Sequence, residues 1–192
     1  MRHVPSATSQ RYLALWFPFL PADRLERLHR VRDGKRSRPS GAQADDAAAH
    51  GAPRVLVART GNALRLAAVD REAWRRGLQP GLTLADARAR VAGLDAVEHD
   101  PAADAAFLET VADDCDRWTP LVALAAPDGL VLDITGCAHL FGGEAAMRTH
   151  VVAHLRRHGL GTRGAVAGTP EAARALARAG REEVVAPGGE AA

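Results

Sequence analysis

The chain has 192 residues, of which 47% are hydrophobic and 25% are charged, and its formal net charge at pH 7 is +2. This apolar content and small net charge exclude a disordered protein. No run of about 18 apolar residues is present, which excludes a membrane-spanning helix. The two cysteines, Cys115 and Cys137, are too few for a disulfide framework and are typical of a cytoplasmic protein.

Arginine dominates the basic residues, because Lys35 is the only lysine among the 25. A guanidinium group suits phosphate recognition, but these arginines are spread along the chain and do not cluster. We therefore interpret the excess as the mark of a genome rich in G and C. The charge permits nucleic-acid binding without demonstrating it.

The most apolar stretch runs from Tyr12 to Ala22, after a polar N-terminus that we expect to be frayed. Its basic flank gives it a faint likeness to a secretory signal, but Pro18 and Pro21 interrupt the apolar run. The sequence instead predicts a buried strand over 11–16, a turn, and a helix over 22–31. Residues 32–52 have no periodicity and predict a basic, low-complexity linker.

A small α/β lobe is predicted over residues 53–100. Two short strand patterns flank the turn residues Thr60-Gly61-Asn62, and Thr83 caps a helix with Asp86 three positions later. The expected elements are strands over 54–59, 63–70 and 95–100 and helices over 70–77 and from 83 onward.

The second half of the chain alternates between helices and strands. Asp100 and Pro101 begin a helix with Phe107, Val111, Cys115 and Trp118 at helical spacing. The elements expected after it are strands over 121–126 and 130–135 around a Pro127-Asp128-Gly129 turn, a helix over 144–157, a strand over 162–168 and a helix from 169 to Gly180. Together these patterns predict an α+β fold, with a mixed sheet, helices packed on one face, and the 53–100 lobe inserted.

Motifs of common enzyme classes are missing from the sequence, including phosphate loops, dinucleotide fingerprints and Cys-x-x-Cys pairs. His150, His154 and His158 have the helical spacing of metal ligands, but neighbouring arginines favour a solvated basic face. Arg71, Arg75 and Arg76 beside Trp74 suit phosphates and bases, although an exposed helix anchored by its tryptophan explains them equally well. The three arginines are therefore candidates for nucleic-acid contact, and the sequence predicts no metal ligand.

Two-metal chemistry requires carboxylates that converge on neighbouring cations. Asp128 stands in the predicted turn and Asp133 in the following strand, while Asp113, Asp114 and Asp116 lie on a helix. No paired carboxylate motif appears in either strand. On the residues alone, the function stays open.

Four blocks of the sequence closely resemble the polymerase-like part of ImuB proteins, which are degenerate Y-family DNA polymerase relatives (UmuC- and DinB-like) of bacterial mutagenesis cassettes. The blocks are LALWFPFLPADRLER, NALRLAAVDREAWRRGLQPGLTLADARA, CDRWTPLVALAAPDGLVLDITGCAHLFGGE and GAVAGTPEAARALAR. The resemblance implies a palm with an inserted fingers lobe. The expected parts are a disordered N-terminus (1–10), palm (11–31 and 101–182), linker (32–52), fingers (53–100) and a flexible tail (183–192).

The departures from active Y-family members concern the residues that carry the chemistry. Their aspartate pair near the end of the first palm strand corresponds here to Trp16 and Pro18. In their Ser-x-Asp-Glu motif the aspartate is kept here as Asp128, and Gly129 replaces the glutamate. In the fingers, the Tyr-x-Ala-Arg that holds the triphosphate corresponds to residues 71–74, Arg-Glu-Ala-Trp. One carboxylate cannot hold two cations, so we expect a lobe that binds and does not catalyse.

The resemblance implies a pseudo-enzyme that acts as an adaptor in DNA repair, translesion synthesis and induced mutagenesis, without a cofactor. The implied partners are damaged or primer–template DNA, an error-prone replicative-type polymerase, a RecA-like accessory protein, and the sliding clamp through a C-terminal region absent here. Two alternatives stay open: an active Y-family nucleotidyltransferase that uses Mg²⁺, and a protein-interaction module without nucleic-acid contact.

Overall fold

The computed structural model describes residues 10–32, 52–181 and 183–186, so most of the predicted N-terminal and linker segments and residues 187–192 of the predicted tail lie outside it. The described residues form two compact units, which are taken in turn below. The first unit contains β1 and the larger share of residues 105–186. The second contains residues 19–104 together with residues 157–161.

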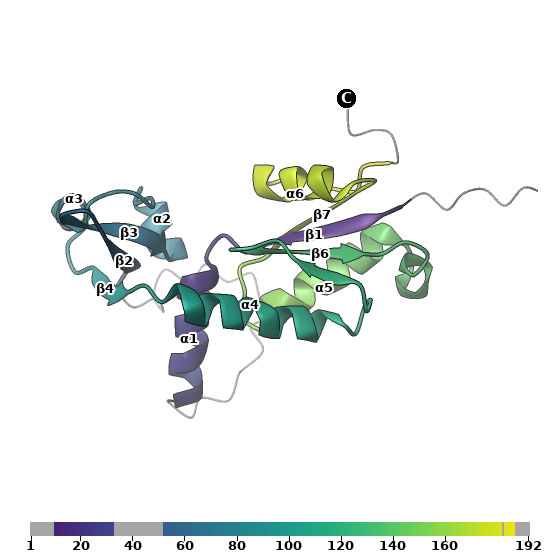
Figure 1. Cartoon of the computed structure of the whole chain (residues 1–192), viewed down its shortest axis with the longest axis horizontal. Helices are drawn as coiled ribbons and strands as arrows, with labels where there is room; N and C mark the ends of the chain where they lie inside the picture. The colour runs from purple at the N-terminus through teal and green to yellow at the C-terminus, as the bar shows by residue number, and fades with distance from the viewer. Residues whose placement is uncertain (1–9, 33–51, 182, 187–192) are drawn as a thin grey trace, which may run out of the picture. The chain divides into compact units, whose positions relative to one another are not determined.

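The first unit is built on a four-stranded sheet with the order β5-β6-β1-β7, and every neighbouring pair is antiparallel (Figure 1). Its strands are β1 (Tyr12–Trp16), β5 (Val122–Leu124), β6 (Gly129–Asp133) and β7 (Arg163–Ala167). The expectation of a mixed sheet is therefore wrong for this sheet. The crossover from β6 through a helix to β7 makes those two strands parallel, but β1 lies between them and runs opposite to both.

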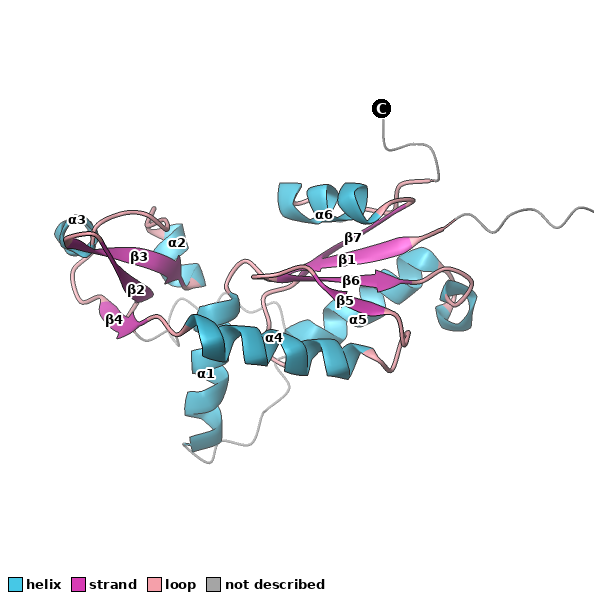
Figure 2. Cartoon of the chain, in the orientation of Figure 1, coloured by secondary structure: helices cyan, strands magenta, loops and turns pink. Residues whose placement is uncertain are grey.

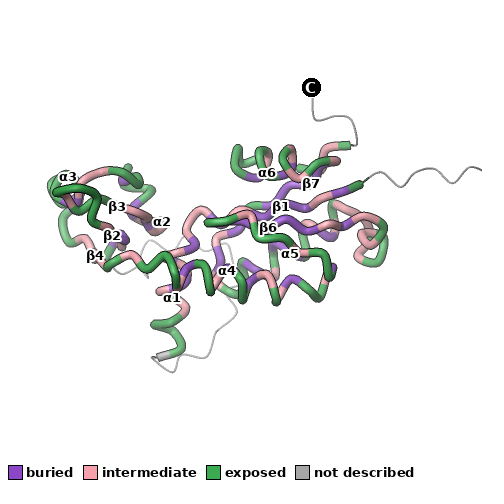
Figure 3. Tube along the Cα trace, viewed as in Figure 1, coloured by how far each residue is buried: buried purple, intermediate pink, exposed green. Residues whose placement is uncertain are grey.

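Helices cover both faces of this sheet, not one as expected (Figure 2). Helix α6 (Pro170–Ala179) packs on the face that carries Ala14. Helix α5 (Glu144–Arg157) packs on the opposite face, where Val152 lies against Gly164, and α4 (Pro101–Cys115) lies beside α5. The reason is that consecutive residues of β1 are buried (Figure 3), and because their side chains point to opposite faces of the sheet, both faces need apolar cover.

Small side chains allow α6 to approach the sheet closely. Ala173 and Ala177 of the helix and Ala165 and Ala167 of β7 are fully buried in one cluster with Ala14. Helix α6 begins where the sequence predicts, because the Thr169 hydroxyl accepts a hydrogen bond from the Ala172 N–H at 3.2 Å. It ends at Gly180, whose φ of 78° favours glycine.

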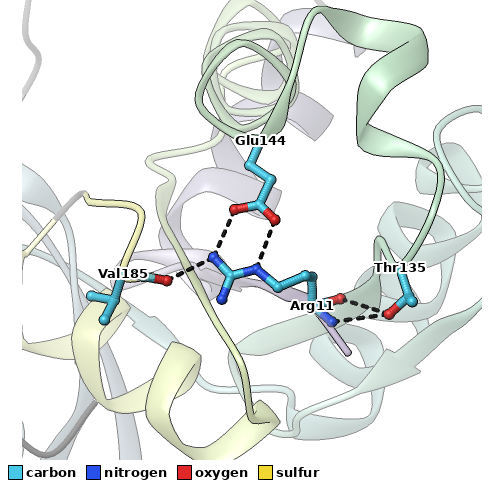
Figure 4. A network of polar contacts seen from close by, with 4 residues as sticks. All are labelled: Arg11, Thr135, Glu144 and Val185. Atoms are coloured by element: carbon cyan, nitrogen blue, oxygen red, sulfur yellow. Dashed lines mark hydrogen bonds and ion pairs between the residues drawn. The ribbon is translucent and has the colours of Figure 1, made fainter. Parts of the chain in front are cut away.

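The outer edge of β7 is covered by residues 183–185, which the sequence analysis assigns to a flexible tail. Val166 donates a hydrogen bond to the Glu183 carbonyl and accepts one from the Val185 N–H, at 3.0 and 2.9 Å. The Val185 carbonyl in turn accepts a hydrogen bond from the buried Arg11 side chain at 2.6 Å (Figure 4). These hydrogen bonds attach residues 183–185 to β7 and to Arg11, although the composition of this segment predicts a flexible tail.

The second unit contains a three-stranded sheet with the order β3-β2-β4, in which β2 pairs antiparallel with β3 and parallel with β4. Its elements are α1 (Leu20–Arg32), β2 (Arg54–Thr60), β3 (Ala63–Val69), α2 (Arg71–Arg75), α3 (Leu84–Arg90) and β4 (Asp95–Glu98). Val55, Leu66 and Leu78 lie at the centre of its core. Helix α1, which the sequence analysis places with the palm, contacts β2 and β3 and falls in this unit.

Two local expectations differ from the structure. The helix that begins at Pro101 ends at Cys115, before Trp118, because the chain turns there with the Trp118 N–H donating to the Cys115 carbonyl. Leu108 is buried on this helix and Phe107 only partly so. The short 3₁₀ helix η1 (Ala138–Phe141) has no counterpart among the elements predicted from the sequence. Among the described residues, none of the helices combines the length and apolar character needed to cross a membrane.

Candidate functional site

Three of the four predicted degenerate positions meet where β1 ends and β6 begins. Trp16 is paired with Gly129 across the two strands. The Trp16 Nε1–H donates a hydrogen bond to Asp128 Oδ2 at 2.9 Å, and the Phe17 N–H donates to the Asp128 carbonyl at the same distance. Pro18 follows two residues after Trp16, in the turn that leaves the sheet. The strand pairing therefore brings together residues that lie 112 positions apart in sequence.

Arginine side chains that were not predicted as site residues surround this junction. The Arg178 guanidinium bonds to both carboxylate oxygens of Asp128. The guanidinium carbons of Arg163 and Arg178 lie over the Trp16 ring, 5.3 and 5.5 Å from its centre, within the range of a cation–π interaction. Arg174 lines a small hollow beside Trp16 with a volume of about 10 Å³, enough for about one water molecule.

Only part of this arginine cluster has a signal in the sequence. Arg174 and Arg178 are four residues apart on a predicted helix, which places them on one face. Nothing in the sequence joins them to Arg163 on β7 or to Trp16 on β1. That association depends on α6 packing against these two strands.

The residues of this site do not form a ligand set for a metal ion. Asp128 is the one carboxylate at the junction, and within the described ranges no three His, Cys, Asp or Glu side chains are grouped to hold a metal. The histidine candidates on α5 do not converge on a metal set either, since His154 Nε2 lies 2.8 Å from Asp114 Oδ2. Burial raises the pKa of Cys115 to about 12, so this thiol stays protonated and is a poor ligand.

The predicted nucleic-acid contacts Arg71, Arg75 and Arg76 lie on α2 and at its C-terminal end, in the second unit. All three are exposed, and Trp74 between them is 51% exposed. Glu72 pairs with Arg75 at 3.7 Å and with Arg76 at 2.8 Å. Exposed pairs of this kind are weak, so both guanidiniums stay accessible. Their contact with nucleic acid remains a prediction.

Arg71 lies beside a partly buried carboxylate, Asp23, with an unusual pKa. Its guanidinium carbon is 5.5 Å from the centre of the Phe19 ring, and it contributes a favourable charge to Asp23. Burial nevertheless raises the pKa of Asp23 from 3.8 to about 6, although the Gly161 N–H donates to its Oδ2 at 2.7 Å. Desolvation of the charged carboxylate outweighs these favourable interactions.

This raised pKa predicts a pH-dependent stability. The folded protein holds the Asp23 proton more tightly than the unfolded chain, so Asp23 favours folding most below pH 4, and this contribution is lost as the pH rises to about 6. The variant Asp23→Asn is neutral throughout and keeps an oxygen for Gly161. We expect it to be more stable than the wild type at pH 7 by about 2 kcal/mol, with the gain vanishing near pH 4.

Urea unfolding between pH 4 and 7 measures this difference. Asp113→Asn is the matched control, because this carboxylate is exposed and its replacement should leave the wild-type pH profile unchanged. An Asp23→Asn variant whose stability follows the wild type at every pH would contradict the expectation.

The fold itself is that of Y-family DNA polymerases. The insertion ternary complex of Dbh DNA polymerase is similar with a TM-score of 0.68 and 16% identity, over 92% of this chain and 48% of that chain. DinB from Sulfolobus solfataricus and a Y-family DNA polymerase chimera containing Dbh are similar with TM-scores of 0.61 and 14% identity. These two comparisons cover 93% of this chain and 48% and 49% of theirs. The predicted α+β, Y-family-like fold class is confirmed.

The sequence is ImuB-like, as the resemblance indicates. Over 114 residues it is 53% identical to Protein ImuB of two strains of Caulobacter vibrioides. This match covers 59% of the chain and 25% of each relative, so the chain spans about a quarter of the length of these curated proteins. No family model matches the chain.

Proposed function

We propose that this chain is a non-catalytic, Y-family-like module that acts in DNA damage tolerance by binding, as an adaptor in translesion synthesis. The similarity to Protein ImuB and to Y-family DNA polymerase structures supports the general role. The non-catalytic part rests on one observation: the carboxylate of Asp128 is bonded to the Trp16 indole N–H and to the Arg178 guanidinium.

Phosphoryl transfer by two metal ions needs carboxylates that bridge or bind both cations. At this junction Trp16 offers an indole, Gly129 offers no side chain, and Asp128 already neutralises a guanidinium. A divalent cation would have to displace Arg178 and would stand close to Arg163, which also lies against Trp16. Like-charge repulsion and the lack of a second carboxylate both oppose metal binding.

The backbone at Gly129 also disfavours the glutamate that active members carry there. A Cβ atom on Gly129 would lie 2.9 Å from the Leu15 carbonyl oxygen and 3.3 Å from that of Ala125. Contacts this short require a shift of the backbone, because a carbonyl oxygen cannot rotate away as a flexible side chain would. A side chain at this position is therefore costly in the present sheet.

Primer extension tests the proposal directly. With a primer–template DNA, the four deoxynucleoside triphosphates and either Mg²⁺ or Mn²⁺, we expect no template-dependent incorporation, because the two-cation geometry has no ligands. Dbh DNA polymerase serves as the positive control. Incorporation by the wild type that is abolished in Asp128→Asn would contradict the proposal and establish a residual nucleotidyltransferase that uses Asp128.

The expected partners extend the proposal. They are damaged or primer–template DNA, an error-prone replicative-type polymerase, a RecA-like accessory protein and the sliding clamp, all in the cytoplasm. Exposed arginines on α2 support the DNA contact, and the three protein partners are those that the resemblance of the sequence blocks to ImuB proteins implies. A module that binds protein partners without DNA is the alternative.

A further inference from the structure

The structure carries a compact cationic cluster at the junction of β1, β7 and α6. It consists of Trp16, Asp128, Arg163, Arg174 and Arg178, and is called the Trp16 cluster below. We infer that the Trp16 cluster is a phosphate-binding site in which guanidinium groups supply the positive charge and no divalent cation is needed. This inference deepens the proposed function and rests on it, since a DNA-binding role would supply the phosphates that this site binds.

The charge balance of the cluster leaves positive charge available to a ligand. Three guanidiniums stand against a single carboxylate, and Asp128 is already paired with Arg178. Arg163 and Arg174 are exposed, and neither guanidinium has a hydrogen bond or an ion pair with another described residue. The cluster therefore differs from α2, where one glutamate pairs with two of the three arginines.

The cluster is also held in place before any ligand binds. Asp128 fixes both the indole of Trp16 and the guanidinium of Arg178. The Trp16 ring in turn packs against the guanidiniums of Arg163 and Arg178. Arg174 projects from the same helix one turn before Arg178, and the buried alanines of α6 anchor that helix to the sheet. Arginines that are ordered in advance lose less conformational entropy when they bind.

Phosphate is the ligand chemistry that this arrangement favours. A guanidinium presents its N–H groups as a planar fork that matches two phosphate oxygens. A half-buried tryptophan beside such forks adds an aromatic surface, a combination found where proteins bind single strands of nucleic acid. The hollow at the cluster has a volume of only about 10 Å³, so the phosphate would rest on the arginines at the surface and would not enter a pocket.

The test is binding of a short, fluorescently labelled single-stranded DNA, measured by anisotropy in EDTA over a series of KCl concentrations. We expect the wild type to bind and Arg163→Ala/Arg174→Ala to bind about tenfold more weakly. Loss of two phosphate contacts should also flatten the slope of log affinity against log salt by about 1.4. Both positions are exposed, so the variant should fold, and its thermal unfolding by circular dichroism verifies this.

The matched control is Arg88→Ala/Arg90→Ala, which removes the same charge from two exposed positions on α3. Its affinity should stay within about twofold of the wild type. An equal loss of DNA affinity in both double variants would overturn the inference. So would DNA binding by the wild type that EDTA abolishes and Mg²⁺ restores. A deoxynucleoside triphosphate added in EDTA distinguishes the source of the phosphate: competition indicates a free nucleotide, and its absence indicates the DNA strand.

Failure of the proposed function is distinguishable from failure of this site. If the double variant on β7 and α6 binds DNA as tightly as the wild type, the module binds DNA elsewhere and only the inference fails. If the wild type binds no DNA, the proposed DNA contact fails. Calorimetric titration with pyrophosphate then tests phosphate binding at the Trp16 cluster without DNA. Binding heat with the wild type that disappears in Arg163→Ala/Arg174→Ala supports the inference, and an absence of binding heat with the wild type overturns it.

Discussion

Replacing Asp104 by alanine is expected to lower the free energy of unfolding by about 3–5 kcal/mol, because it leaves a buried guanidinium without its carboxylate. Asp104 Oδ1 accepts a hydrogen bond from Arg24 Nε at 2.6 Å, and Oδ2 lies 2.9 Å from His99 Nε2. The side chains of Arg24 and Asp104 are only 10% and 8% exposed. Water therefore cannot take the place of the missing acceptor.

Urea unfolding monitored by circular dichroism measures this loss. Glu26→Ala is the matched control in the same unit, because Glu26 pairs with Arg30 on the surface, where both side chains are about half exposed, and its loss should stay below about 1 kcal/mol. Asp104→Asn keeps an oxygen acceptor, so its loss in free energy of unfolding should lie between those of Asp104→Ala and Glu26→Ala. Equal losses for Asp104→Ala and Glu26→Ala would show that burial does not determine the strength of the first pair.

Glu144→Ala is expected to lower the free energy of unfolding by about 2–3 kcal/mol. This loss is smaller than the loss for Asp104→Ala because the Glu144 side chain is 28% exposed. Both of its carboxylate oxygens accept hydrogen bonds from Arg11, from Nε at 2.7 Å and from Nη2 at 2.6 Å. Figure 4 shows that the same guanidinium reaches the Val185 carbonyl. The variant therefore leaves a charge stranded between β1, the start of α5 and the segment that covers β7.

A second variant separates the stranded charge from lost packing. Arg11→Met/Glu144→Leu removes both partners and keeps apolar volume, so it should recover at least half of the stability lost in Glu144→Ala. Urea unfolding of the wild type and both variants gives the comparison. If the double variant is no more stable than Glu144→Ala, the uncompensated charge is not the cause of the loss.

The local structure was predictable wherever a few neighbouring residues determine it. Thr83 caps α3 by accepting a hydrogen bond from the Asp86 N–H at 3.1 Å, as the capping pattern predicts. Helix α5 has the predicted bounds, Glu144–Arg157. In these cases the side chain and the backbone group that it satisfies are close in sequence, so the pattern contains the whole interaction.

Long-range arrangement was less predictable. The order of elements predicted a mixed sheet, but in the first unit β1 lies between β6 and β7 and makes all neighbouring pairs of named strands antiparallel. The consecutive apolar residues of β1, such as Ala14 and Leu15, indicate a strand that is buried on both faces, but they do not indicate which helix covers each face. The order of strands in a sheet depends on which apolar surfaces pack together in three dimensions. Local patterns along the sequence do not show which distant surfaces these are.

By itself, the sequence determined the helix caps, the turns and the α+β class. Through its resemblance it also predicted three positions where polymerase residues are replaced and one, Asp128, where the aspartate is kept. Only the tertiary structure decided what the replacements do: Trp16 donates to Asp128, Arg178 neutralises that carboxylate, and Arg163 joins them from another strand. The reason is distance along the chain. Trp16 and Asp128 are 112 positions apart, and only the pairing of β1 with β6 and the packing of α6 bring their side chains together.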